Sequence, residues 1–190
     1  MPPAEPDRPP NLQPTLIGDT VLVRPLRADD WHEMFAAASD PLIWELHPVR
    51  DRFTEPVFRE YFDGAIASES AFAIVEHATG LIIGSSRFHG YNPERSEIEI
   101  GWTFLARNHW GRTTNREIKC LMLQHAFTFV DTVVFWVGEA NWRSQRAMEK
   151  IGANRRGGIA LRPTSGGTHV VFEITRAEFL SSAHALRRCP

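Results

Sequence analysis

The sequence predicts one α+β domain, in which helices cover both faces of a mixed, mostly antiparallel sheet. At 190 residues with 43% hydrophobic content, the chain is long enough for one sizeable core and short for two domains. Helix-like and strand-like segments are interspersed along it, and most successive strands are joined by short turns. Only the strands expected at 97–104 and 132–137 are joined through a helix, the usual connection between parallel strands. We therefore expect α/β/α layers with one parallel strand pair.

Each expected element has a local signal. Strand segments are rich in β-branched and aromatic residues, and helix segments repeat apolar residues at three- and four-residue spacing. Pro41 ends the first helix, Gly80 closes a hairpin connection, and Gly152 follows a helix C-terminus. Thr175 and Glu178 form a capping box for a last helix. Strands are expected at 20–26, 71–76, 81–88, 97–104, 132–137, 155–161 and 169–174, helices after Asp29 or Asp30, at 54–66, 114–130, 142–151 and beyond 175, and a turn at Pro163, Gly166 and Gly167.

The N-terminus differs in composition from the rest of the chain. Residues 1–14 hold six of the thirteen prolines and no apolar stretch of the kind found in secretory signals. We therefore expect a flexible leader at 1–14 and a single domain at 15–190.

The composition excludes several functional classes. The formal net charge of −2 argues against a nucleic-acid partner, because such proteins gain affinity by neutralising many phosphates. No apolar run approaches the ~20 residues that span a bilayer, so no membrane partner is expected. The histidines lack metal-ligand spacing, so no metal is expected. Cys120 and Cys189 give neither a disulfide framework nor a metal motif, which favours a reducing, cytoplasmic location.

The stretch from residue 97 to residue 152 carries the strongest functional signal. A strand, a short polar loop and a helix follow one another, and the loop reads LARNHWGRTTN. A loop that opens a helix directly after a strand presents free backbone N–H groups and the positive end of the helix dipole. These groups bind phosphate, so the first hypothesis is a phosphate-bearing cofactor.

Short motifs in this stretch also carry a family resemblance. The strand contains Glu99-Ile100-Gly101-Trp102, the loop contains Trp110-Gly111-Arg112 with Glu117 six residues after Gly111, and the later helix contains Asn141-x-x-Ser144 and Glu149-Lys150-Ile151-Gly152. Together they resemble the GNAT superfamily of acyl-coenzyme A dependent N-acetyltransferases, and most of all its ribosomal-protein N-terminal acetyltransferase branch. The corresponding segments of that branch read AEIGY, WGKGYATEA, N-x-x-S and EKxGF. The element order resembles the family from Thr15 to about Leu180.

The resemblance implies acetyl-CoA as the cofactor and assigns residues to it. Asn108, Gly111 and Thr113 occupy the family's Gln/Arg-x-x-Gly-x-Gly/Ala positions, and two of the three depart from that pattern. Thr113 is compatible with the role if its backbone is helical or extended, because backbone amides bind the pyrophosphate. Asn108 is expected to act as a cap, with Arg107 or Arg112 supplying charge. In the family, two splayed parallel strands hold the pantetheine arm, which Trp102 to Leu105 would contact here. With the loop and the later helix included, the resemblance implies these cofactor-binding residues: Trp102, Thr103, Phe104, Leu105, Asn108, Trp110, Gly111, Arg112, Thr113, Thr114, Asn141 and Ser144.

Acetyl transfer needs a base. An attacking amine must be neutral, whereas an α-amino group titrates near about 8 and a lysine near about 10.4. Glu97 and Glu99 lie two residues apart on one expected strand, so both project from the same face. Glu99 is the expected base because it matches the glutamate of the family's EIGY segment, and Glu97 is the alternative. Burial or an acidic neighbour must raise the pKa of the chosen carboxyl, and a solvent-facing strand without a catalytic role remains the other interpretation.

The leaving thiolate needs a proton. Many family members use a tyrosine seven residues after the asparagine, and Met148, which has no proton to donate, stands at that position. Ser144 is the expected general acid, with water as the alternative. Asn141 and Ser144 are also suited to capping or orienting the short helix without a further role. No Ser-His-Asp or Cys-His arrangement is indicated, so direct attack in a ternary complex is expected.

Three functions are considered. The first is an N-acetyltransferase that acts on a primary amine of a protein N-terminus or a small molecule. The second is a non-catalytic acyl-CoA sensor or partner module of the same fold. The third, a nucleotide-binding α/β protein, lacks a P-loop lysine and an acidic ribose contact. By analogy with the family, Trp44, Arg87 and Tyr91 are expected near the acceptor pocket, and core packing is the other interpretation of Trp44. A monomer or a homodimer is expected.

Overall fold

The computed structural model describes residues 9–162 and 167–181. The predicted residues Pro163, Gly166 and Cys189, and the start of the expected leader, lie outside these ranges. In chain order the elements are β1 (Leu16–Ile17), β2 (Val21–Pro25), η1 (Ala28–Asp30), α1 (Trp31–Ala38), η2 (Pro41–Ile43), α2 (Glu55–Ala67), β3 (Ala71–Glu76), β4 (Ile82–Asn92), β5 (Glu97–Leu105), η3 (Arg107–His109), α3 (Thr114–Ala126), β6 (Thr132–Gly138), α4 (Trp142–Lys150), β7 (Asn154–Leu161), β8 (Thr168–Thr175) and α5 (Arg176–Ser181).

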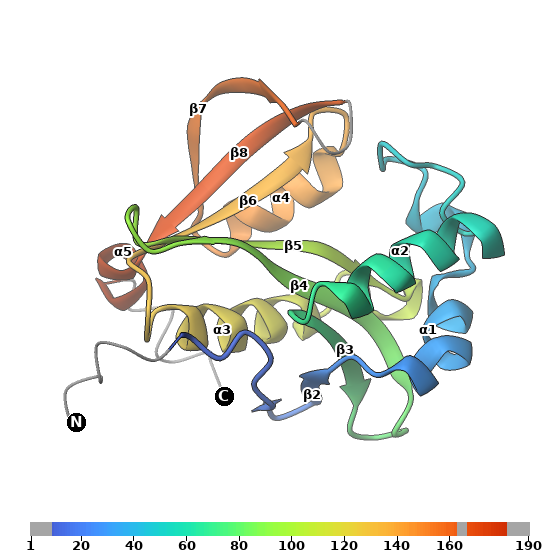
Figure 1. Cartoon of the computed structure of the whole chain (residues 1–190). Helices are drawn as coiled ribbons and strands as arrows, with labels where there is room; N and C mark the ends of the chain where they lie inside the picture. The colour runs from blue at the N-terminus through green and yellow to red at the C-terminus, as the bar shows by residue number, and fades with distance from the viewer. Residues whose placement is uncertain (1–8, 163–166, 182–190) are drawn as a thin grey trace.

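The strands form one mixed sheet in the order β1-β2-β3-β4-β5-β6-β8-β7 (Figure 1). Every neighbouring pair is antiparallel except β5 and β6, which are parallel and connected through α3. The predicted sheet type and the predicted parallel pair are therefore confirmed.

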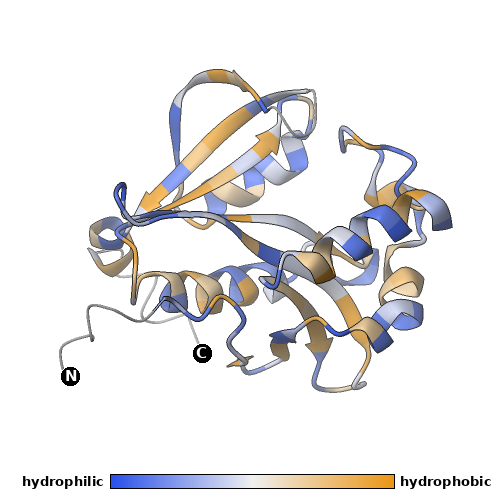
Figure 2. Ribbon diagram, in the orientation of Figure 1, coloured by the Kyte–Doolittle hydropathy of each residue, from blue (hydrophilic) through white to orange (hydrophobic). Residues whose placement is uncertain are grey.

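Two hydrophobic clusters show that helices cover both faces of the sheet. On one face, α1 and α2 pack an aromatic-rich cluster that includes Trp31, Phe58 and Phe62 against the sheet. On the other face, α3 buries Ile118 and Met122 in the larger cluster, to which α4 and α5 also contribute. Figure 2 shows the apolar residues concentrated on the strands and on one side of the helices. No helix in the described part of the chain is both long and apolar enough to cross a membrane.

The parallel pair is short, and this creates the space in which the site lies. Register partners run only from Glu97 opposite Thr132 to Glu99 opposite Val134. Past that point β6 follows β8, whereas β5 follows β4, so the two strands separate (Figure 1). The register between β4 and β5 also shifts here, because Ser86 lies opposite two residues, Trp102 and Thr103. This β-bulge holds Trp102 at a positive φ of 50°.

The differences from the expected elements have local causes. The two-residue strand β1 and the short 3-10 helices are too brief for a periodic signal. Asp30 precedes α1 without capping it, because its carboxylate accepts the Arg27 backbone N–H and pairs with Arg24. Helix α3 ends at Ala126, and its apolar continuation to Val130 forms turns. The predicted capping box is confirmed, with reciprocal Thr175 and Glu178 bonds at the start of α5.

The end of the expected leader contacts the domain. The Asn11 carbonyl lies 2.7 Å from His125 Nε2, and the Gln13 side chain donates to the Ala71 carbonyl at 3.0 Å. Leu12 packs against the larger hydrophobic cluster. These contacts attach residues 11–13 to α3 and β3.

Candidate active site

A first cavity of about 980 Å³ lies between the loop before α3 and the start of α4. One wall is formed by Thr103 to Leu105 of β5 and by His109 to Thr113 of the loop. The opposite wall is formed by residues 141–144 and by later residues of α4. Its size and its position at the N-terminal end of α3 suit an elongated ligand that carries phosphate.

The tip of the loop has the backbone that this role requires. Gly111 has a φ of +72°, a conformation that side-chain-bearing residues rarely adopt, and a Cβ there would meet no atom within 4 Å. Thr113 is helical, with φ −76° and ψ −15°, so a β-branched residue is accommodated. The first N–H groups of α3 have no partner within the helix. The loop can therefore present backbone donors to an anion without steric obstruction.

Helix α4 brings Asn141 and Ser144 to the same cavity. Asn141 Oδ1 accepts the Ser144 backbone N–H at 3.1 Å, so Asn141 caps the helix as the alternative interpretation anticipated. The cap uses only the amide oxygen, and no residue of the described chain accepts a bond from Asn141 Nδ2. Met148, one turn after Ser144, is buried at the inner side of α4.

Glu99 is a buried carboxylate rather than a solvent-exposed one. Its side chain is almost entirely inaccessible, and Arg162 binds both oxygens at 2.8 and 2.7 Å. Burial raises the pKa of Glu99, and the Arg162 charge opposes that rise. Glu97, on the same face, pairs with Arg156. Both carboxylates thus meet arginines from the β7 region, which the local sequence around them does not reveal.

The bulge is fixed from three sides. Tyr61 Oη donates to the Trp102 carbonyl at 2.8 Å. Thr103 Oγ1 lies 2.8 Å from Ser86 Oγ and accepts a bond from Lys119 Nζ at 2.7 Å. Lys119 is only 2% exposed, and burial lowers its pKa to about 7. These bonds hold β5 in its irregular conformation at the point where it leaves β6.

A second cavity of about 290 Å³ adjoins the first one. Its polar lining includes His47, Arg52, Lys119, Arg162 and His169, and Gly101 to Thr103 form part of its wall. The residues that line both cavities are Trp44, His47, Thr103, Asn115, Asn141, Ser144 and Ala147. The two cavities therefore meet beside the bulge and the start of α4.

The outer wall of the second cavity comes from the segment after α1. His47 Nδ1 accepts the Val49 N–H at 2.9 Å, and His47 Nε2 lies 3.1 Å from Arg52 Nη1. Burial, reinforced by the Arg52 charge, lowers the pKa of His47 to about 3, so the ring is neutral near pH 7. Trp44 is buried and also lines both cavities, so it combines core packing with a place at the site.

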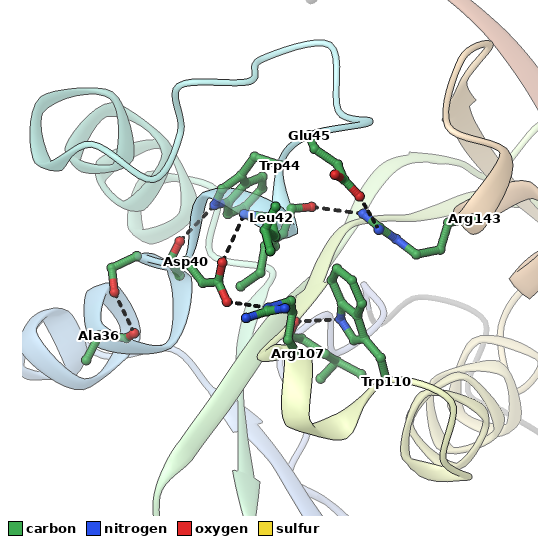
Figure 3. Close-up of polar contacts among 12 residues, drawn as sticks. Ala36, Asp40, Leu42, Trp44, Glu45, Arg107, Trp110 and Arg143 are labelled. Atoms are coloured by element: carbon green, nitrogen blue, oxygen red, sulfur yellow. Dashed lines mark hydrogen bonds and ion pairs between the residues drawn. The ribbon is translucent and has the colours of Figure 1, made fainter.

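Polar contacts connect this segment to the loop and to α4 (Figure 3). Asp40 pairs with Arg107, and Glu45 pairs with Arg143. Arg143 also lies over the Trp110 ring at 3.9 Å. Arg107 is thereby engaged away from the cavity, and Arg112 is the loop arginine that lines it.

The structure brings together most of the predicted site residues. Ten of the predicted positions line one or both cavities: Trp102, Thr103, Phe104, Leu105, Trp110, Gly111, Arg112, Thr113, Asn141 and Ser144. Asn108, in η3, Thr114, buried at the first turn of α3, and the predicted base Glu99 do not line them. Tyr91 packs against the Phe129 ring and lies outside both cavities.

Sequence reasoning missed several residues of the site. Lys119 had a detectable signal, because it is a lysine inside the apolar run from Ile118 to Leu123. Trp142 is 54% exposed at the wall of the first cavity, with Arg146 over its ring at 5.1 Å. Arg52 and Arg162 gave no local signal, because their contacts depend on the tertiary fold.

Comparisons with known proteins agree with this geometry. The acetyltransferase (GNAT) domain profile matches residues 20–154. The chain is similar to a GCN5-related N-acetyltransferase from Brucella melitensis, with 23% identity over 94% of this chain and 86% of that one and a TM-score of 0.77. It is also similar to a GNAT-family acetyltransferase from Bacillus anthracis, with 21% identity, coverage of 87% and 100%, and a TM-score of 0.72.

A third similar structure is Mycobacterium smegmatis RimJ in complex with CoA-disulfide, with 18% identity, coverage of 88% and 87%, and a TM-score of 0.66. No curated protein matches the sequence. The domain match covers most of the chain. The chain therefore belongs to the GNAT family of acetyl-CoA dependent N-acetyltransferases.

Proposed function

We propose that the protein transfers the acetyl group of acetyl-CoA to a primary amine, with the coenzyme in the first cavity and the acceptor in the second. The observation that carries this proposal is the junction of the two cavities at Thr103, Asn141 and Ser144. At this junction β5 and β6 have separated, so backbone groups of β5 no longer face a strand partner on that side. A thioester placed there would be accessible to an amine from the second cavity.

The residues of the first cavity fit coenzyme A. Backbone amides from Gly111 to Thr114 would hold the pyrophosphate at the positive end of α3, with Arg112 adding charge. Asn141 would donate its amide N–H to the pantetheine arm. Trp142 offers an exposed ring for stacking by the adenine. When bound, the coenzyme supplies an acetyl group activated as a thioester.

The residues of the chain then transfer two protons, one from the acceptor and one to the leaving sulfur. Glu99 lies behind the wall of the second cavity, bound to the lining residue Arg162, and accepts one proton from the ammonium form of the acceptor through water, which frees the nitrogen lone pair. The nitrogen–carbon bond forms as the carbon–sulfur bond breaks. Ser144 or water carries the second nitrogen proton to the departing sulfur, since Met148 has no proton to give. Direct attack of this kind needs no acyl-enzyme.

The substitution Glu99→Gln tests the base. Glutamine keeps the shape of the side chain but accepts no proton, so we expect acetylation to fall by roughly 100-fold or more. Coenzyme A affinity, measured by calorimetry, is expected to stay within about twofold of wild type.

Glu97→Gln is the matched control, because Glu97 lies on the same strand and face and is also paired with an arginine. It is expected to retain activity. Full activity in Glu99→Gln together with loss in Glu97→Gln would transfer the role to Glu97.

One observation favours a second candidate, a non-catalytic acyl-CoA sensor. The two-pronged contact with Arg162 opposes the rise in the pKa of Glu99 and so weakens it as a base. If the wild-type protein binds coenzyme A but acetylates none of a broad panel of amines and N-terminal peptides, monitored by release of free thiol, the sensor function is the better description.

A further inference from the structure

The second cavity has an excess of positive charge that acetyl transfer alone does not require. Arg52, Lys119 and Arg162 line it, and no aspartate or glutamate of the described chain does so. Arg87 lies beside it, with its guanidinium carbon 4.9 Å from the centre of the Trp102 ring. Glu99 is bound by Arg162, which leaves the remaining cations of this group without a carboxylate in direct contact among the described residues.

Arg87 is a buried cation with one unpartnered nitrogen. It is 8% exposed, and its Nε is buried without a hydrogen-bond partner. Its contacts within the described chain are with the faces of Tyr61 and Trp102. Burial lowers the pKa of Arg87, and the Tyr61 hydroxyl and the Glu99 charge oppose that shift only in part. A buried guanidinium needs hydrogen-bond acceptors, and no residue within the described ranges accepts a bond from Arg87 Nε.

Arg52 completes a pair of guanidiniums around one aromatic ring. Its guanidinium carbon lies 5.0 Å from the Tyr61 centroid, and that of Arg87 lies 5.8 Å from the same ring. Arg52 Nε is also buried without a partner. Two nearby like charges repel each other, which adds to the cost of burying each ion. An anion between or beside them would remove both costs.

The phosphates of coenzyme A do not meet this need. The proposed pyrophosphate site is at the loop tip around Gly111, which lines the first cavity and not the second. The end of the coenzyme that reaches the junction is an uncharged thioester. The missing anion must therefore belong to the acceptor.

We propose that the acceptor is a small amine that carries an anionic group, a carboxylate or a phosphate, and that Arg52 and Arg87 bind this group. The proposal rests on the assignment of the second cavity to the acceptor. Planar guanidiniums recognise both anions through paired N–H donors. Arg87 lies opposite Gly101, two residues along β5 from Glu99, so the anion and the amine are expected to be only a few bonds apart.

The first experiment measures anion binding without turnover. With coenzyme A saturating, inorganic phosphate and glycolate are titrated while the melting temperature is recorded. At least one is expected to raise the melting temperature of wild type by about 2 °C or more, since a ligand that binds only the native state stabilises it. Arg52→Gln and Arg87→Gln should lose most of that shift. Arg59→Gln is the matched control, because Arg59 also stacks on an aromatic ring, that of Trp31, but is exposed and away from both cavities.

The second experiment compares acceptors in pairs that differ by the anion. Ethanolamine is compared with phosphoethanolamine, glucosamine with its 6-phosphate, and amino acids with their amides. The charged member of at least one pair is expected to have a kcat/KM at least tenfold higher, and this ratio should fall toward one in Arg52→Gln and Arg87→Gln. The pair that responds distinguishes phosphate from carboxylate. An Arg87→Lys variant is available if Arg87→Gln does not fold.

The outcomes separate this inference from the proposed function. Acetylation of uncharged amines or neutral N-terminal peptides at least as efficiently as their anionic analogues would overturn the inference and leave the acetyltransferase function standing. Anion binding that depends on Arg52 and Arg87 without acetylation of any amine would instead count against the proposed function. Equal melting shifts in wild type and both arginine variants would also overturn the inference.

Discussion

Lys119 shows how a single residue can set the pH dependence of the fold. It is buried with one hydroxyl partner, and its pKa is lowered to about 7 from an unfolded value near 10.4. Between these values the unfolded chain binds a proton that the native state binds weakly. The free energy of unfolding contributed by this residue therefore rises with pH across that interval.

The substitution Lys119→Met tests this account. Methionine removes the charge and keeps much of the volume, so we expect the free energy of unfolding to increase by roughly 1–4 kcal/mol near pH 6. The gain should shrink as pH approaches 10, where the wild-type lysine is neutral in the native state. Urea titrations at several pH values measure both effects, and a gain that does not change with pH would contradict the buried-cation account.

Gly111 makes a second prediction at this scale. A β-branched residue at φ +72° is strained, so Gly111→Val is expected to destabilise the loop by about 1–2 kcal/mol. Because backbone amides are displaced with it, coenzyme A affinity should fall by roughly tenfold. Gly80→Val is the control, since Gly80 also has a positive φ and open surroundings but lies in the β3–β4 hairpin turn and lines neither cavity. A loss of affinity in both variants would indicate a general effect of instability.

The predictability of single residues depended on whether their role is local. The loop at Gly111 and the helix cap at Asn141 depend only on neighbouring residues, and the sequence around them was sufficient to predict them. Glu99 was identified, but its partner Arg162 lies 63 positions away and was missed. Arg52 and Arg87 belong to separate segments that only the folded chain brings to the same ring.

At the scale of elements, the bulge in β5 depends on a contact from α2. Tyr61 donates to the carbonyl of Trp102, the residue with positive φ. In Tyr61→Phe this carbonyl loses its partner, so we expect a loss of about 1–3 kcal/mol in stability and a lower rate of acetylation as β5 relaxes. Tyr91→Phe, at the other tyrosine of the chain, is the control. Equal losses of stability and rate in both variants would contradict a specific role for the contact between Tyr61 and the bulge.

Helices and strands followed the sequence closely wherever their signals were periodic. The expected strand at 71–76 coincides with β3, and the helix expected from Thr54 begins at Glu55 with Thr54 at its N-cap. The bulge was not foreseen, although Gly101 directly precedes Trp102 and a glycine inside a strand often marks a bulge. The contacts from Tyr61 and Lys119 that hold it come from α2 and α3, so the local sequence does not contain them.

At the scale of the whole molecule, the parallel pair was predictable because a helical crossover leaves few alternatives. The order of β7 and β8 was harder to foresee, since β8 rather than β7 lies beside β6. This arrangement matters for the site, because it places Arg156 and Arg162 of the outer hairpin region against the carboxylates of β5. The chemistry of Glu99 thus depends on a part of the chain beyond residue 154, where the family match ends.

The brevity of the β5–β6 ladder has a mechanical consequence. Three register pairs form the seam between a half-sheet of β1 to β5 and a half-sheet of β6, β8 and β7. Such a seam can act as a hinge. A ligand inserted between the strands would supply hydrogen bonds to both of them where they no longer pair with each other. Hydrogen–deuterium exchange should therefore slow at amides of residues 101–105 and 135–138 when coenzyme A is added, while the interior of β3 is unchanged. Uniform slowing across the sheet would instead indicate that the two halves open and close as one body.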